Sequence, residues 1–169
     1  VYELIDSHEF AGKAHWFIAL YWDLDETEID KGDAEHFMAL VTGLEIGFVP
    51  HLSLLQKFEN HVPEILPQLV GAILEDETSK APARLNNLLI SSRKDAEWIA
   101  EQFQDQPELL ATAYITICNA GRGASGHSFD HDATLFGVAI DLCPDFIHEY
   151  VASRYQSKDF LSRHDEDHR

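Results

Sequence analysis

The sequence predicts an all-α fold of about eight to ten helices, arranged as antiparallel helix pairs that stack side by side. Two observations lead to this fold. A proline followed by an acid and two apolar residues occurs three times, and apolar residues recur at helical spacing around each copy. The copies are residues 63–66, 107–110 and 144–147, at intervals of 44 and 37 residues. Similarity at a nearly fixed interval is typical of chains that stack one small unit.

Apolar residues stand at matched offsets on both sides of each proline. Nine and eight residues before the prolines lie Leu54-Leu55, Trp98-Ile99 and Leu135-Phe136. The offsets after the prolines hold Ile65, Leu66, Leu69, Val70, Ile73 and Leu74 in the first copy, Leu109, Leu110, Ala113, Tyr114, Ile117 and Cys118 in the second, and Phe146, Ile147, Tyr150, Val151, Arg154 and Tyr155 in the third. Steps of one and three residues place each set on one helix face. Each unit is therefore predicted to be a helix, a tight turn and a second helix.

The elements before the first motif follow from the same periodicity. A first helix is expected over residues 7–24, and an acid-rich loop over 23–33. A second helix carries Phe37 and Val41 and ends near Gly43 or Gly47, because glycine terminates helices readily. Pro50 is expected to open a third helix, because proline at the first helical position loses no intrahelical hydrogen bond.

The later elements are placed in the same way. Pro63 opens the fourth helix, and residues 75–83 are polar and turn-like. An additional helix starts near Pro82 and carries Leu85, Leu88 and Leu89. Helices are then expected over residues 94–103, 107–119, 130–142 and 144–155, with a glycine-rich loop over 121–126. Residues 114–117 have strand-like composition, but the periodicity places them in a helix.

Helix pairs whose second helix opens with proline and an acid resemble HEAT or armadillo repeats, whose units are about 40–47 residues long. The resemblance covers about residues 49–155. It implies an α-solenoid, or an irregular right-handed helical array, that serves as a protein-binding scaffold. The chain is then one domain over 1–169, with a divergent helical pair in 1–48, repeat-like pairs in 49–155 and a polar tail in 156–169. We expect it to be a piece of a larger protein.

The charge of the chain restricts its partners. The formal net charge is −18, which disfavours direct binding of nucleic acid or of anionic membrane surfaces. It permits a protein partner, including a basic one. The chain has no apolar run of membrane-spanning length. Its two cysteines, Cys118 and Cys143, do not form a disulfide framework, so buried reduced thiols and a cytoplasmic location are expected.

The residues best suited to hold a metal follow the glycine-rich loop. They are His127, Asp130, His131 and Asp132, because imidazole and carboxylate groups bind divalent metals. The alternative is an exposed loop closed by an aspartate that caps the next helix. The pair His131-Asp132 also resembles that of HD-type metal phosphohydrolases. That resemblance implies a further histidine, for which His51 and His61 are available, and an aspartate, for which Asp141 and Asp145 are available.

Three functions are therefore open. The first is a protein–protein interaction module. The second is an acidic helical antagonist, either an immunity-type protein or a nucleic-acid mimic, that binds a basic partner. The third is a metal-dependent hydrolase around residues 127–132. The sequence contains no catalytic nucleophile motif, and the glycine-rich segment matches no phosphate-binding motif. We therefore predict neither an enzyme nor a cofactor.

Overall fold

The computed structural model describes residues 25, 28–43, 51–76, 80–89, 93–120 and 133–156. Within these ranges the chain is helical and contains no strand. The helices are α3 (Lys31–Gly43), α4 (Leu52–Phe58), α5 (Ile65–Glu75), α6 (Ala81–Leu89), α7 (Arg93–Gln102), α8 (Pro107–Ala120), α9 (Ala133–Leu142) and α10 (Phe146–Gln156). The predicted all-α class is therefore confirmed for this part of the chain. The expected helix over residues 7–24, the glycine-rich loop and the tail from 157 lie outside it.

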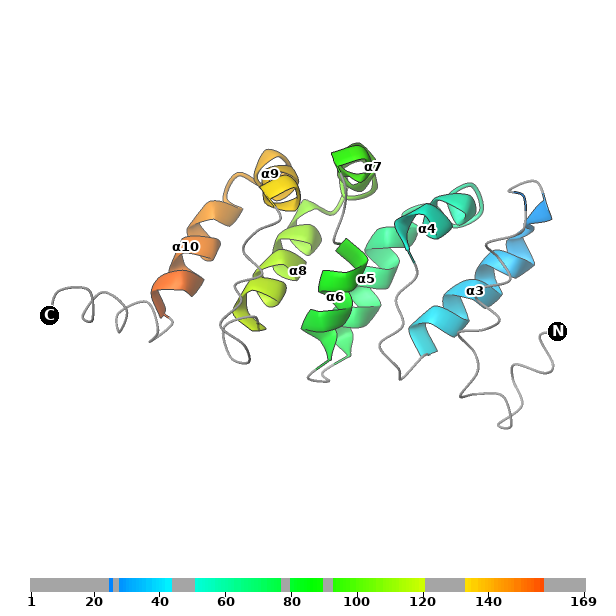
Figure 1. Ribbon diagram of the computed structural model, residues 1–169, viewed down its shortest axis with the longest axis horizontal. Coiled ribbons are helices and arrows are strands. Elements are labelled where there is room, and N and C mark those ends of the chain that lie inside the picture. Colours follow the sequence, from blue (N-terminus) through cyan, green and yellow to red (C-terminus); the bar gives the residue numbers. More distant parts are fainter. Residues whose placement is uncertain are drawn as a thin grey trace, which may run out of the picture.

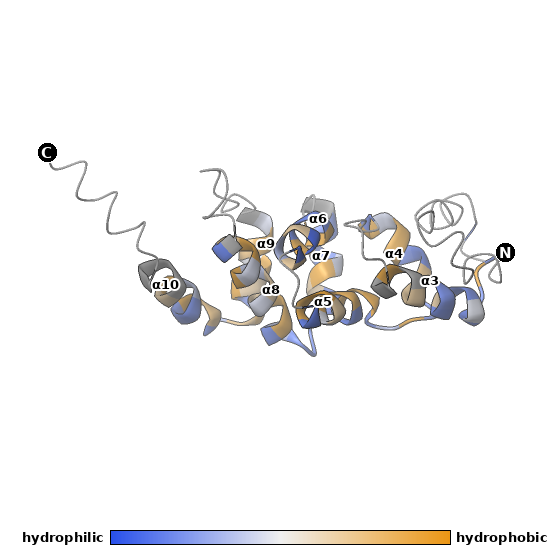
Figure 2. Cartoon of the chain, turned by 90° about the horizontal axis from the view of Figure 1, so that it is seen from below, coloured by the Kyte–Doolittle hydropathy of each residue, from blue (hydrophilic) through white to orange (hydrophobic). Residues whose placement is uncertain are grey.

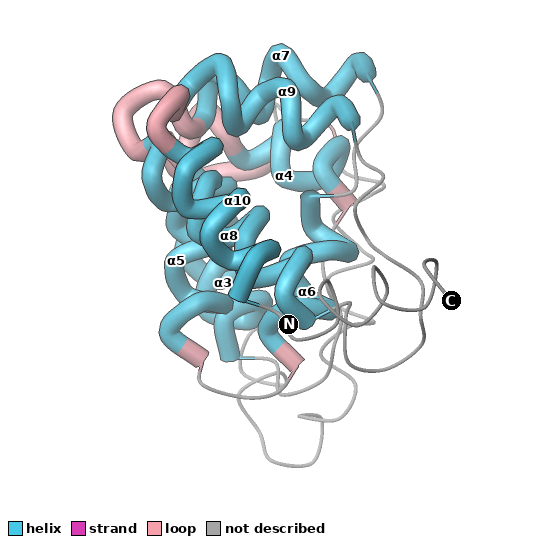
Figure 3. The backbone as a smooth tube through the Cα atoms, turned by 90° about the vertical axis from the view of Figure 1, so that its left-hand side faces the viewer, coloured by secondary structure: helices cyan, strands magenta, loops and turns pink. Residues whose placement is uncertain are grey.

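The helices form two rows along the long axis of the molecule. Figure 1 shows α4, α7 and α9 in an upper row and α3, α5, α8 and α10 in a lower row. Contacts between α5 and α8, and between α8 and α10, hold the lower row together, and α7 contacts α9 in the upper row. In the end view of Figure 3, α10, α8, α5 and α3 lie one behind another. Successive helix pairs, α4–α5, α7–α8 and α9–α10, therefore follow one another along the chain.

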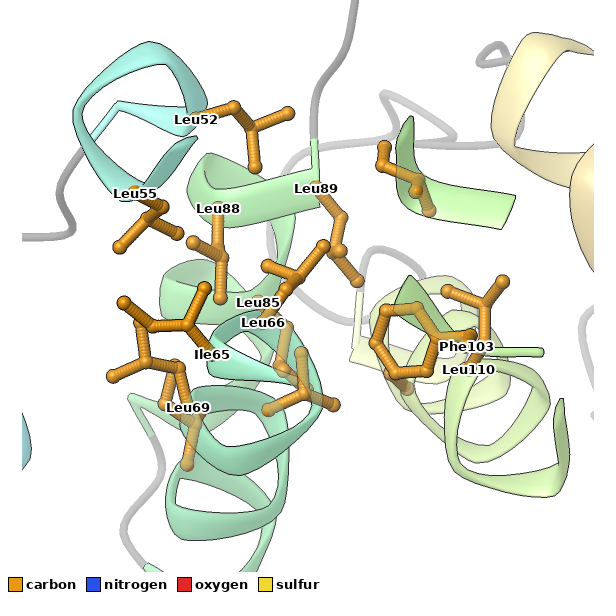
Figure 4. Packing of buried hydrophobic residues seen from close by; sticks show 14 of the residues in the cluster. Leu52, Leu55, Ile65, Leu66, Leu69, Leu85, Leu88, Leu89, Phe103 and Leu110 are labelled. Carbon is orange, nitrogen blue, oxygen red and sulfur yellow. The ribbon is translucent and has the colours of Figure 1, made fainter. Parts of the chain in front are cut away.

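Helix α6 is the additional helix that the sequence predicts in the middle interval. It packs against both α5 and α8. Figure 4 shows Leu85 and Leu88 lying over the side chains of α5, while Leu89 points toward Phe103 and the α8 side. These three leucines are all buried. An apolar face on α6 thus covers the junction between the first and second helix pairs.

The matched apolar positions form most of the core. Phe58, Phe103 and Ala139, which precede the three prolines by four or five residues, are all 0% exposed. Figure 2 shows apolar residues in orange along all the helices from α3 to α10. The third pair departs from this pattern, because Phe136 and Tyr150 are only half-buried and Val151 is exposed. Trp98 is buried, as the sequence predicts.

The three prolines do not play identical roles. Pro107 is the first residue of α8, as predicted. Helix α5, by contrast, begins at Ile65, two residues after Pro63, because Glu64 takes a left-handed conformation with φ of 57°. A residue in that conformation cannot continue a right-handed helix, and a non-glycine residue there is strained by about 1–2 kcal/mol. Helix α10 likewise begins at Phe146, after a turn through Pro144.

Polar side chains fix the start of α3. Asp30 precedes the helix, and its carboxylate accepts a hydrogen bond from the backbone N–H of Asp33 at 2.9 Å. The carboxylate of Asp33 accepts one in return from the backbone N–H of Asp30 at 3.2 Å. This reciprocal arrangement satisfies donors that a helix start leaves unpaired. Part of the predicted acid-rich loop is therefore a helix cap, and α3 then ends at Gly43, as expected.

The third expected helix starts later than the sequence predicts. His51 is the residue that caps α4. Its ring Nδ1 accepts a hydrogen bond from the backbone N–H of Ser53 at 3.3 Å. The first helical residue is Leu52. A histidine cap therefore takes the place of the expected proline start.

None of the described helices is suited to crossing a bilayer. The longest of them, α8, has 14 residues, whereas a bilayer-spanning helix needs about 20 apolar residues.

Candidate functional site

The turns within the three helix pairs lie along one edge of the molecule. They follow α4, α7 and α9 and comprise residues 59–64, 103–106 and 143–145. In Figure 3, seen down the long axis, these turns gather in pink at the upper left. Figure 1 shows that they are spread along the length of the two rows. We call this surface the turn edge.

A network of hydrogen bonds joins the first two turns. The carboxylate of Glu59 accepts one from the indole N–H of Trp98 and one from the amide of Gln102, both at 3.0 Å. The amide oxygen of Gln102 accepts a hydrogen bond from the backbone N–H of Leu66 at 3.5 Å. The bonded partners are separated by between 36 and 43 positions in the sequence. This separation is about one interval of the proline motif. They therefore fix the register of one helix pair against the next.

A further bond in the network holds the strained residue. The amide of Gln106 donates a hydrogen bond to the carboxylate of Glu64 at 3.0 Å. On the other side, the amide of Gln68 donates to the backbone carbonyl of Pro63 at 3.0 Å. Both bonds stabilise the turn that carries the left-handed Glu64. A strained backbone persists where neighbouring contacts fix it in this way.

Aromatic rings make the junction between the second and third pairs. The ring of Tyr114 on α8 lies 5.6 Å from Phe136, 5.7 Å from Phe146 and 6.0 Å from Tyr150, measured between ring centroids. Phe136 and Tyr150 are 5.1 Å apart. Such tilted and edge-on pairs contribute about 0.5–1.5 kcal/mol each beyond their burial. The first junction therefore combines apolar packing by α6 with a polar network, whereas aromatic rings pack at the second.

Carboxylates accumulate at the turn edge. Each turn and the adjoining helix ends contribute at least two of them: Glu59, Glu64, Glu101, Asp105, Glu108, Asp141, Asp145 and Glu149. All except the half-buried Glu59 are exposed. No lysine or arginine occurs in residues 58–76, 95–120 or 133–153. In the part of the chain that the structure describes, the turn edge is therefore strongly acidic, and Lys57 in the last turn of α4 is the basic residue at these helix ends.

Helix stability explains some of these acids but not others. Glu108 and Glu149 lie in the first turns of α8 and α10, where the positive end of the helix dipole favours a negative charge. Glu101 and Asp141 lie in the last turns of α7 and α9, and neither turn contains a basic residue. A negative charge there is unfavourable by about 0.3–1 kcal/mol. Unfavourable local choices of this kind are typical of functional surfaces.

The described structure does not include the loop proposed to hold a metal. His127, Asp130, His131 and Asp132 lie outside the described ranges. The further histidines and aspartates named for a phosphohydrolase site are dispersed: His51 caps α4, His61 lies in the first turn, and Asp141 and Asp145 lie by the third. No group of three or more histidine, cysteine or carboxylate side chains suited to a metal occurs among the residues described.

The cysteines behave partly as the sequence predicts. Neither forms a disulfide, and Cys118 is buried in α8, as expected. Cys143 is only half-buried, because it lies in the turn before Pro144 and not inside a helix.

The polar network at the first junction was not foreseen from the sequence. The sequence does contain a hint of it. Trp98 and Gln102 stand four residues apart, so a polar side chain shares a helix face with the tryptophan. Periodicity cannot identify Glu59 as the hydrogen-bond acceptor of these two side chains, because Glu59 lies about 40 residues earlier in the chain.

Replacing Glu59 with alanine is expected to lower the free energy of unfolding by about 1–2 kcal/mol, because the indole and amide donors lose their acceptor in a part-buried place. Denaturant unfolding measures the change. The double variant with Gln102→Ala should lose less than the sum of the single variants. Additive losses would mean that the two side chains are not coupled.

Comparison with known proteins gives no relative on which to base a function. No family model matches the chain, no curated protein matches it, and no solved structure matches it.

Proposed function

We propose that the protein is a protein–protein interaction module, a HEAT- or armadillo-like scaffold that binds a basic protein along the turn edge. The observation that carries the proposal is the placement of Glu101 and Asp141. Both are exposed carboxylates at helix ends where the dipole disfavours them. A cationic partner would convert that unfavourable interaction into a favourable one.

The arrangement of the helices supports the same function. Three consecutive pairs offer their turns on one edge, so an extended partner can contact all of them at once (Figure 1). The network around Glu59 and Gln102 holds the first two turns in a fixed relation. A rigid row of charges binds with less loss of conformational freedom than a flexible one. Cys118 and Cys143, which form no disulfide, fit a module that works in the reducing cytoplasm.

Two matched pairs of substitutions test this proposal. Glu101→Gln with Asp141→Asn removes two charges from the turn edge, whereas Glu28→Gln with Glu35→Gln removes two exposed charges at and before α3. Lysozyme and pancreatic ribonuclease serve as basic probes in titration calorimetry. At low salt the first double variant is expected to raise Kd about threefold to tenfold, since exposed ion pairs contribute about 0.2–1 kcal/mol each. The control should change Kd less than about twofold.

Two outcomes would overturn the proposal. One is the absence of salt-sensitive binding to either probe. The other is an equal loss of affinity in both double variants, because that result would show a response to net charge and not to the turn edge.

The acidic antagonist is the second candidate, and the net charge of −18 favours it. An antagonist of a nuclease covers the surface that binds nucleic acid, so it blocks activity as well as binding. Titrating the chain into ribonuclease during RNA cleavage separates the two functions. Stoichiometric loss of cleavage supports the antagonist, and binding with full cleavage supports the scaffold.

A further inference from the structure

The first and second proline motifs have the same sequence pattern but different backbones. Pro107 begins α8, and Glu108 lies in the first turn of that helix. Glu64 instead precedes α5 in a left-handed conformation with φ of 57°. Among the residues that the structure describes, Glu64 is the one non-glycine residue with a positive φ. Such backbone outliers cluster at functional sites.

The two motifs differ in the residue that stands four positions after the proline. This residue is Pro67 in α5 and Ala111 in α8. In a helix that began at Pro63, residue 67 would donate its backbone N–H to the carbonyl of Pro63. Pro67 has no N–H, and its ring would clash with that carbonyl. Ala111 has the N–H and no such ring, so α8 can begin at the proline of its motif.

Two side-chain hydrogen bonds replace the helix that Pro67 excludes. The amide of Gln68 donates to the backbone carbonyl of Pro63 at 3.0 Å, so it supplies the donor that Pro67 lacks. The amide of Gln106, in the turn of the next pair, donates to the carboxylate of Glu64, also at 3.0 Å. The side chain of Glu64 makes no capping hydrogen bond to α5. The Glu64 carboxylate thus bonds to the second turn and not to its own helix.

The third pair shows that a late helix start does not by itself produce a left-handed residue. Helix α10 begins at Phe146, two residues after Pro144, and the residue four positions after that proline is His148. The backbone N–H of His148 donates to the carbonyl of Asp145 at 3.1 Å, as in a tight right-handed turn. No residue of this motif has a positive φ. The left-handed conformation therefore occurs in the motif that contains the second proline.

We infer that Pro67 is a positioning residue for partner binding at the turn edge. It excludes the helical conformation of Glu64, and the hydrogen bond from Gln106 selects the left-handed alternative, which joins the first turn to the second. Glu64 and Gln106 are both exposed, so this bond lies on the surface that the partner meets. The inference rests on the proposed function, because fixing the two turns beforehand reduces the conformational freedom lost on binding.

The Pro67→Ala substitution tests the first step, because it makes the first motif like the second. We expect α5 to begin at Pro63 and Glu64 to become helical. The NOE between the amide and α protons of Glu64, which is strong at positive φ, should then weaken. Pro82→Ala is the matched control, since Pro82 lies in the first turn of α6 and outside the turn edge. This control should leave the NOE of Glu64 unchanged.

Binding of lysozyme, measured by titration calorimetry at low salt, tests the positioning role. Pro67→Ala should raise Kd about threefold, because the first two turns must then be ordered on binding. Gln106→Ala should raise Kd by a similar factor, and the two substitutions together should give no further increase. A proline that only stabilised the fold would act equally with and without Gln106. Pro82→Ala should leave Kd unchanged, and circular dichroism checks that every variant keeps its helices.

The results distinguish this inference from the proposed function. Absence of salt-sensitive binding in the wild-type chain overturns both. If the wild-type chain binds and the double variant of Glu101 and Asp141 binds more weakly, the proposed function stands. The inference alone is then overturned if Pro67→Ala keeps Glu64 left-handed or leaves Kd unchanged. It is also overturned if the effects of Pro67→Ala and Gln106→Ala on Kd multiply, because the proline would then act independently of that bond.

Discussion

Replacing Phe58 with alanine is expected to lower the free energy of unfolding by about 3–5 kcal/mol, the range for a buried phenylalanine. Phe58 is 0% exposed, and its ring stacks on that of Phe37 with 4.1 Å between centroids and 11° between planes. The substitution therefore opens a cavity between α3 and α4 and also removes a ring contact. Denaturant or thermal unfolding measures the loss, which is a large part of the stability of a typical domain.

Val151→Ala provides the control for this result. Val151 is 40% exposed and lies on the last described helix, so truncating it should change the free energy of unfolding by less than about 1 kcal/mol. A comparable loss in the two variants would contradict the assignment of Phe58 to the core. A loss below about 1 kcal/mol for Phe58→Ala would also contradict that assignment, because deleting a buried ring lowers the free energy of unfolding by more than this.

Replacing Asp76 with alanine is expected to lower the free energy of unfolding by about 2–3 kcal/mol. Asp76 follows α5, and its carboxylate pairs with the guanidinium of Arg84 on α6 at 3.1 Å. The side chain of Arg84 is 7% exposed, and its Nε has no hydrogen-bond partner. Removing the carboxylate leaves a buried cation with less compensation, which costs about 3–5 kcal/mol for fully buried pairs. The expected loss is smaller because Asp76 is 35% exposed.

The Arg84→Met substitution distinguishes the contribution of the ion pair from the cost of leaving the Arg84 charge buried without its partner. Methionine fills much of the same volume without a charge, and replacing a buried ion with an apolar side chain is often neutral or stabilising. We therefore expect Arg84→Met to change the free energy of unfolding by less than about 1 kcal/mol in thermal unfolding. The Asp76→Ala substitution should also become nearly neutral in the Arg84→Met background. If Asp76→Ala costs as much in that background as alone, its effect arises from the helix end and not from Arg84.

The helices and their buried faces were predictable because both depend on local pattern. Leu85, Leu88 and Leu89 recur at helical spacing, so their helix and its core-facing side follow from 3.6 residues per turn. The same argument places residues 114–117 in α8 despite their strand-like composition. The start of α8 at Pro107 follows from the missing N–H of proline, which costs nothing at a helix start.

The acidic edge was predictable only as composition. Net charge and the absence of basic residues from long segments are visible in the sequence. That Glu101 and Asp141 share an edge depends on how the pairs align, and alignment comes from contacts between helices distant in the chain. The candidate metal residues His127 to Asp132 lie outside the described ranges, so that hypothesis stays a prediction.

Residues within one or two helical turns thus determine where this chain is helical, which side of each helix is apolar and where Pro107 begins α8. Long-range contacts determine the rest. Glu64 adopts a left-handed conformation although its tetrapeptide matches that of Glu108, and Gln106 from the next pair donates a hydrogen bond to its carboxylate. Val70 and Val151 occupy the same position of their motifs, yet one is buried and the other exposed. Such exposure depends on which helices pack beside a position, and periodicity within a segment carries no information about its neighbours.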